Sequence, residues 1–237
     1  MDEHSSIPPA PPEPPPYVPP LPPTPPPPSA LPLPWEQPGY PFFNALFDTT
    51  KLFLTEPAAA FARVSTAVSM WRPFLYGCIL GFLLNVFTAT YQFLFRLTMP
   101  NQMPDWLGRE MGQGISAAAA YAINILVSPF AIPLGILFGS CVIHLFLMLV
   151  GGAKHGFAAT VRSISYSYAP AIIGIIPACG AVVAGIWSIV LCVLGLAALH
   201  QISRGKAVAA ILLPIVLCCA CFLPLFFIFG MKNWMPH

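Results

Sequence analysis

Apolar residues fill four long stretches of the chain, and charged residues mark the ends of these stretches. Residues 73–95 carry no charge, and Arg96 follows them. A run of about 23 such residues is long enough for a helix that crosses the hydrocarbon core of a membrane. A similar run fills residues 207–230. We therefore expect both segments to be transmembrane helices.

The run between Arg162 and Arg204 is too long for a single span. Its 41 residues (163–203) include no Lys, Arg, Asp or Glu. As one helix they would extend about 62 Å, twice the hydrocarbon thickness of about 30 Å. The chain must turn inside this run, and Pro177–Gly180 is the best place, because glycine accepts the dihedral angles of a tight turn. The pattern predicts spans over 161–176, with Pro170 inside it, and over 180–199.

The run between Glu110 and Lys154 leaves two topologies open, because Pro129 and Pro133 lie near its middle. It is either a hairpin of two spans or one span over 129–150 preceded by an interfacial or tilted segment. Five spans with the N-terminus inside place seven Lys and Arg residues on the inner side and three outside, whereas six spans place four inside and six outside. The positive-inside rule favours five spans.

Residues 42–72 show helical periodicity of another kind. Apolar residues recur at helical spacing in "FFNALFDTTKLFL", with Asp48 and Lys51 elsewhere on the helical wheel. Pro57 suits the first turn of a second helix, which should extend to about Met70. Short amphipathic helices that precede a span commonly lie in the membrane interface. We expect 42–72 to form interfacial helices and 73–237 to form the five-span membrane domain.

Proline dominates the N-terminal part, where residues 8–41 hold 19 of the 30 prolines. Because proline fixes φ and lacks an N–H group, this tract can form neither a helix nor a sheet ladder. We expect 1–41 to be a disordered tail with polyproline II character. Its Pro-Pro-x-Tyr motif is a pattern that WW-type modules bind, so the tail is either a ligand for protein partners or a spacer. The motif consists of Pro14, Pro15, Pro16 and Tyr17.

Composition agrees with a membrane protein of the all-α class. The chain is 57% hydrophobic and only 8% charged, whereas soluble domains carry about 25% charged residues. A helix bundle in a lipid bilayer follows from these values. The net charge of +2 and the lack of a basic stripe do not favour nucleic acid as a partner.

Candidate chemistry is sparse in the apolar segments. After Glu110 the sequence has no Asp or Glu, so carboxylate pairs for acid–base catalysis and for ion coupling are missing there. Ser140 precedes His144 by one helical turn, but without an orienting acid we expect no catalysis. We interpret His144 as bonded to a neighbouring helix, with a ligand or pathway role as the alternative. Cys218, Cys219 and Cys221 have no histidine at zinc spacing, so we expect neither metal nor cofactor.

Small residues spaced by four suggest close approach between helices. Such spacing places both residues of a pair on one helix face, where another backbone can approach. Packing within the bundle and homo-oligomerisation are both consistent with this pattern. The pairs are Gly77 with Gly81, Gly135 with Gly139, and Ala181 with Gly185.

Three segments resemble the Ypt-interacting-protein (Yip) family of multi-pass membrane proteins. They are "EPAAAFARV", "HLFLMLVGGAKHGFAATVRSISYSYAP" and "IIPACGAVVAGIWSIVLCVLGLAALHQISRGKAVAAILLP". The likeness covers about residues 55–225. It is strongest in Gly151-Gly152, Tyr166-Ser167-x-x-Pro170, Ile186-Trp187, Gly195-Leu196 and Lys206-Ala207.

This resemblance implies five spans and a cytosolic N-terminal region. Eukaryotic members of the family are associated with Rab-type GTPases and vesicle traffic. The acidic Asp-Leu-Tyr-Gly-Pro signature of many such members is replaced here by Trp71-Arg72-Pro73. The chain is therefore more similar to the prokaryotic branch, which implies the bacterial inner membrane.

Two functions are compatible with these features. The first is a non-enzymatic scaffold that organises a membrane or recruits partners through its cytoplasmic tail. The second is a channel or carrier for a neutral or anionic small solute, because broken helices mark many transporter sites. Its polar lining would come from Asn85, Asn124, His144 and Tyr168. Copurifying proteins would favour the first function, and a water-filled central path the second.

Overall fold

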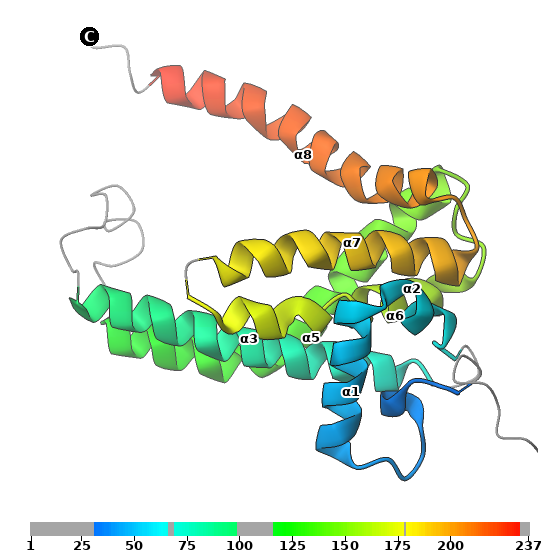
Figure 1. The fold of residues 1–237 in the computed structure, drawn as a ribbon. Helices are drawn as coiled ribbons and strands as arrows, with labels where there is room; N and C mark the ends of the chain where they lie inside the picture. The colour runs from blue at the N-terminus through cyan, green and yellow to red at the C-terminus, as the bar shows by residue number, and fades with distance from the viewer. Residues whose placement is uncertain (1–30, 66–68, 99–115, 178, 233–237) are drawn as a thin grey trace, which may run out of the picture.

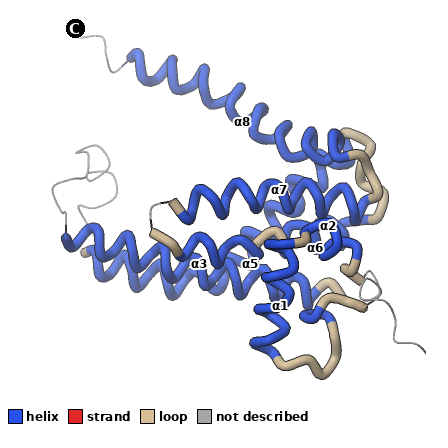
Figure 2. The backbone as a smooth tube through the Cα atoms, viewed as in Figure 1, coloured by secondary structure: helices blue, strands red, loops and turns tan. Residues whose placement is uncertain are grey.

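The computed structural model describes residues 31–65, 69–98, 116–177 and 179–232, with the side chains described as far as residue 221. Within these residues the secondary structure is entirely helical, as the apolar pattern predicts (Figure 2). The tail motif Pro14–Tyr17 lies outside the described residues, so the expected disorder of 1–30 stays a prediction.

Among the described residues, four helices are long and apolar enough to cross a membrane. They are α3 (Trp71–Thr98), α5 (Ala117–Leu149), α7 (Gly180–His200) and α8 (Arg204–Lys232). Helix α7 begins at Gly180, at the end of the expected turn, and is followed by Gln201, which has left-handed dihedral angles. The protein is therefore an integral membrane protein with at least these membrane-length helices.

Helix α5 shows which of the two topologies the run after Glu110 adopts. It is one helix of 33 residues with Pro129 and Pro133 inside it, so the hairpin alternative is wrong. Pro129 cannot donate to the carbonyl of Ile125, but the Ser128 hydroxyl donates to that oxygen at 3.0 Å. The helix starts earlier than the expected residue 129, and its length of about 50 Å requires it to tilt in a 30 Å core or to project from it.

The segment expected to span over 161–176 is not a continuous helix. It consists of α6 (Gly156–Tyr166) and the 3-10 helix η3 (Ala169–Ile175). Pro170 lacks the N–H that would bond the Tyr166 carbonyl, and its ring disfavours helical dihedral angles at Ala169. Together α6 and η3 run between the two ends of the bundle (Figure 1). Neither is long enough to cross a membrane by itself, so residues 161–176 do not form one continuous membrane-length helix.

In the part of the chain that the structure describes, three short elements precede the long helices: η2 (Pro34–Glu36), α1 (Phe42–Thr55) and α2 (Pro57–Ala62). Helix α1 lies crosswise to the long helices (Figure 1). Helix α2 ends well before the expected Met70. Leu33 and Trp35 are buried in the core, so the expected disordered tail is wrong for residues 31–41. The burial of these apolar side chains favours an ordered arrangement of the segment.

An aromatic cluster joins these short elements to the bundle. The Tyr166 ring stacks on Phe53 of α1 with centroids 4.8 Å apart, and it packs against Tyr76 of α3 at 5.2 Å. All three side chains are fully buried. One hydrophobic core therefore lies where α1, α3 and α6 meet, and a smaller one joins α5, α7 and α8 around Leu147 and Leu196.

The small-residue pairs differ in what they contact. An added Cβ at Gly77 would lie 3.0 Å from the Ser165 backbone, and one at Gly81 would lie 3.0 Å from Ile132. At Gly135, Gly139 and Gly185 an added Cβ would meet nothing within 4 Å. The first pair thus permits close packing inside the bundle, whereas Gly135, Gly139 and Gly185 face open space.

We predict that Gly77→Ala destabilises the protein and that Gly135→Ala does not. The methyl group added at position 77 meets backbone atoms of α6, so α3 and α6 must separate at a cost of about 1–3 kcal/mol. The methyl group added at position 135 meets nothing, and alanine has the better helix propensity, by up to about 1 kcal/mol. The free energy of unfolding in detergent micelles measures both effects. Equal losses for the two variants would contradict the packing described for Gly77.

Candidate functional site

Glu36 of η2 is a buried carboxylate, with only 3% of its surface exposed. Its Oε1 atom accepts a hydrogen bond from the Tyr166 hydroxyl at 2.7 Å. Its Oε2 atom accepts one from the backbone N–H of Ser65 at 2.9 Å. The positive charges of Arg162 and Arg72 also act on it. A carboxylate so placed connects the N-terminal segment to α6, which lies 130 positions further along the chain.

Residues 31–37 are fastened to the bundle by further hydrogen bonds, and we call this segment the N-terminal clasp. The Trp35 indole N–H donates to the Arg72 carbonyl at 2.7 Å, and the Trp35 backbone N–H donates to Thr49 Oγ1 at 3.0 Å. The Arg72 guanidinium donates to the Glu36 carbonyl at 3.1 Å. Arg63 donates to the Leu31 carbonyl at 2.9 Å. The clasp therefore fixes the point at which the proline-rich tail joins the bundle.

The pKa of Glu36 is raised above its ordinary value of 4.5, because burial disfavours the charged form. The hydrogen bonds from Ser65 and Tyr166 and the charges of Arg162 and Arg72 lower the pKa, but less than burial raises it. Protonation of Glu36 thus favours the docked clasp. Its stabilising effect is complete below pH 4.5 and is lost as the pH rises through the raised pKa.

A second polar group connects α5, α6 and α7 through Thr160. The Thr160 hydroxyl lies 2.8 Å from Nδ1 of His144 and 2.9 Å from Nε2 of His200. The His155 backbone N–H donates to Nδ1 of His200 at 3.3 Å. Neutral His200 therefore carries its proton on Nε2 and donates it to Thr160, whose own hydroxyl donates to His144. This chain of bonds leaves neither ring nitrogen of His200 for a ligand.

The sequence predicted that His144 bonds to a neighbouring helix, but it did not predict that His155 and His200 belong to the same hydrogen-bonded group. Both flank loops between apolar runs, and nothing in the local sequence connects them to Thr160. Among the described residues, no group of three or more His, Cys, Asp and Glu could hold a metal ion. The hydrogen bonds of this group hold α5, α6 and α7 in a fixed orientation.

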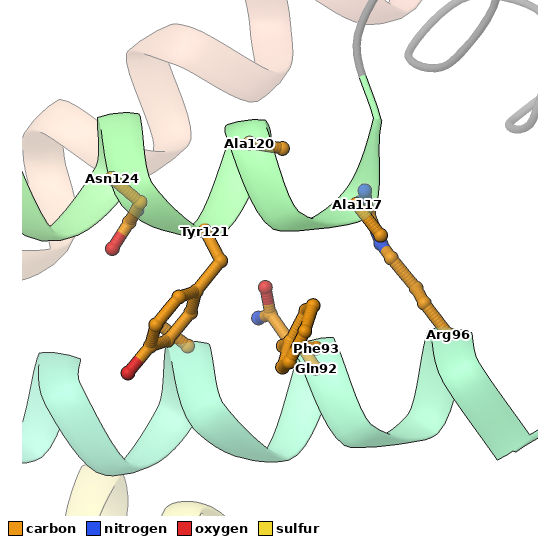
Figure 3. Close-up of a pocket in the computed structure, with 8 residues that line it drawn as sticks. Gln92, Phe93, Arg96, Ala117, Ala120, Tyr121 and Asn124 are labelled. Carbon is orange, nitrogen blue, oxygen red and sulfur yellow. The ribbon is translucent and has the colours of Figure 1, made fainter.

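Asn85 and Asn124 form a third polar group, between α3 and α5. The Asn85 amide donates to Asn124 Oδ1 at 3.0 Å. Beside them is a pocket of about 170 Å³ in which Phe93 and Tyr121 stack at 5.1 Å. Figure 3 shows the Arg96 side chain extending toward Ala117 at the start of α5.

The four polar candidates of the apolar segments do not converge. Asn85 pairs with Asn124, while His144 bonds to Thr160 on α6. Tyr168 lies against Gly81 and lines a different cavity. Ala181 and Gly185 line that same cavity. The described residues therefore do not bring these side chains to a common path.

Comparison with protein families gives one result. A family model described as the Yip1 domain matches residues 51–226, which is 176 of the 237 residues and includes most of every long helix. Comparisons with the curated proteins and with the solved structures gave no match. The clasp lies before the matched region, whereas its partners Ser65, Arg72 and Tyr166 lie inside it.

We predict that Glu36 and Tyr166 contribute to stability as a coupled pair. Tyr166→Phe removes the hydroxyl but keeps the stacked ring, and Glu36→Gln turns an N–H₂ group toward one of the two donors. Each change should lower the free energy of unfolding in detergent by about 1.5–3 kcal/mol. The double variant should lose less than the sum, by at least about 0.5 kcal/mol. Additive losses would show that the hydroxyl and the carboxylate act independently.

We also predict that the clasp is protected more strongly at low pH. Amide hydrogen exchange of residues 31–37, corrected for the intrinsic pH dependence, should be slower at about pH 5 than at about pH 8. Exchange should be slower at the lower pH because protonation removes the negative charge of the buried Glu36 carboxyl, and this stabilises the docked clasp. Glu36→Gln should remove the difference, while the exposed Glu56→Gln serves as the control and should keep it. Faster exchange at the lower pH in the wild type would contradict the raised pKa.

Proposed function

The chain belongs to the Yip1 domain family, and from this we propose that it is a non-enzymatic scaffold that organises a membrane or recruits partners. The proline-rich N-terminal tail is the recruiting element. Its PxxP and Pro-Pro-x-Tyr patterns belong to the class of ligands that aromatic grooves bind in an extended conformation. Recruitment through the tail requires no reacting residues and no cofactor.

The N-terminal clasp is the observation that carries this proposal. Arg63 donates to the carbonyls of Leu31 and Pro32, and Glu36 is bound at both carboxylate oxygens. A segment held this firmly gives the preceding 30 residues a fixed origin on the bundle. An extended polyproline chain of that length reaches about 90 Å. A fixed origin and a long reach suit a tail that presents motifs to partners near the membrane.

We propose five spans, with α6 and η3 together forming a broken third span and the N-terminus in the cytoplasm. In this topology Lys154, Arg204 and Lys206 lie at the inner end of the bundle, and Arg96 lies at the outer end. The positive-inside rule supports this orientation. The proposed location is a bacterial inner membrane, consistent with the missing eukaryotic signature.

We predict that partner proteins are lost when the tail is removed. The test is affinity purification from crosslinked native membranes, followed by quantitative mass spectrometry of the full chain and of a variant lacking residues 2–30. The deletion stops before Leu31 because the clasp belongs to the folded core. Tyr17→Ala should remove only the partners that bind the Pro-Pro-x-Tyr motif.

The control for this experiment is the stability of the deletion variant, which should match that of the full chain because no described contact is removed. Partner lists that are the same for the full chain and the deletion variant would overturn the scaffold proposal. Loss of partners with both variants would assign the binding to the motif around Tyr17.

A further inference from the structure

A groove of about 390 Å³ lies between α7 and the broken segment of α6 and η3. Its volume falls within the range of about 300–1,000 Å³ that small-molecule sites occupy. Residues of α3 form part of its wall, and Ile211 of α8 lies at its margin. No function described above uses this groove.

The wall formed by α7 is a row of small side chains. Ala181, Gly185, Ser188 and Cys192 all line the groove, and their spacing of three or four residues places them along one face of the helix. From the first to the last, this row extends about 16 Å along the helix axis. The groove is therefore elongated in the direction in which α7 crosses the membrane.

The helix break at Pro170 forms the opposite wall. Ser167 and Tyr168, which separate α6 from η3, line the groove together with Ala171. Gly174 lies so close to Leu84 that an added Cβ would be 2.6 Å from its Cδ1 atom. The same Cβ would lie 3.6 Å from the Ala184 Cβ of α7, so η3 packs closely against both α3 and α7 at Gly174, and the groove lies beside this contact.

The groove opens to the lipid-facing surface of the protein. Helix α8 leaves the other helices as it runs toward its C-terminal end (Figure 1). Beyond Ile211 most of its described side chains are exposed, including Leu212 and Ile215. Ile189, at the edge of the groove, is 55% exposed. The groove is therefore continuous with the surface that contacts acyl chains.

The chemistry of the lining favours an apolar occupant. Among the described residues that line the groove, none is charged, and the polar atoms belong to the hydroxyls of Ser167, Thr88, Ser188 and Tyr168 and to the thiol of Cys192. The Ser167 hydroxyl already donates to the Ser163 carbonyl at 2.7 Å. A bound water needs two to four polar partners, and the four remaining side-chain groups, spread along the groove, offer few of them. Acyl chains are the apolar molecules that surround the site.

We propose that this groove is a binding site for one acyl chain of a membrane phospholipid, which lies along α7 between Ala181 and Cys192. The elongated shape, the uncharged lining and the lateral opening together fit a linear chain. The site depends on the membrane-length helices and not on the proposed scaffold function. Its test therefore stands apart from the tail experiment.

The experiment uses the full chain in liposomes of phosphatidylcholine that contain a small fraction of the same lipid with a diazirine on one acyl chain. After irradiation and digestion, mass spectrometry measures lipid attached to peptides of η3 and α7 and to the exposed face of α5. Gly185→Leu fills the groove at a position where an added Cβ meets nothing within 4 Å. Gly135→Leu is the matched control, because Gly135 has the same open surroundings on α5.

We predict that the wild-type groove is labelled more strongly than the exposed face of α5. In Gly185→Leu the groove labelling should fall to the level of the exposed α5 face, because the leucine side chain occupies the space beside α7 that the acyl chain would fill. Gly135→Leu should leave it unchanged. Ala181→Leu, at the other end of the row, provides a second variant if Gly185→Leu does not fold, and it should lower the labelling as well.

Two results would overturn the proposal. Labelling of the groove and of the α5 face to the same extent would show that lipid contacts the groove only as it contacts any exposed surface. Equal labelling of the groove in Gly185→Leu and Gly135→Leu would show that no chain occupies the space beside Gly185.

Discussion

The missing N–H group of Pro170 is the constraint on which the rest of the bundle depends. It ends α6 at Tyr166 and leaves backbone groups that lipid cannot satisfy. The break must therefore be surrounded by protein, and the close contacts of the bundle gather around it. Gly77 faces Ser165, Gly81 faces Tyr168 and Gly195 faces Ser163, each at a distance that a larger residue would disturb. The Tyr91 hydroxyl donates to the Ile175 carbonyl at 2.6 Å and so satisfies the end of η3.

The buried carboxylate of Glu36 lies in the same region, where it is bonded to Tyr166 at the end of α6. Placing an acid in the core costs free energy unless it is hydrogen-bonded and near positive charge. Tyr166, at the end of α6, supplies one donor, and Arg162, one turn earlier, supplies charge. Because Tyr166 and Arg162 hold fixed positions on α6, they favour a single docked arrangement of the N-terminal clasp. A segment joined by apolar contacts alone would have no such fixed register, so the acid contributes specificity as well as stability.

The length of the apolar runs predicted the four long helices, because hydrocarbon thickness and helix rise leave few alternatives. The effect of each proline was not predictable from the sequence. Pro129 remains inside α5, where the Ser128 hydroxyl satisfies the carbonyl of Ile125, whereas Pro170 ends a helix. The clasp was missed because Trp35 and Glu36 stand in a proline-rich tract and the partner of Glu36 is 130 residues away. The contact of His200 with Thr160 likewise depends on tertiary packing.

The way in which polar side chains are used bears on the choice between a scaffold and a carrier. A carrier needs polar groups that are free to bind a solute and that face a common path. Here the Asn85 amide is bonded to Asn124, and both ring nitrogens of His200 are engaged. The Asn85–Asn124 bond holds α3 to α5, and the bonds around Thr160 join α5, α6 and α7. The polar groups engaged in these bonds are therefore not free to bind a solute. A bundle in which the described polar groups lock helices together is consistent with the proposed scaffold, whose N-terminal clasp needs a fixed surface on which to dock.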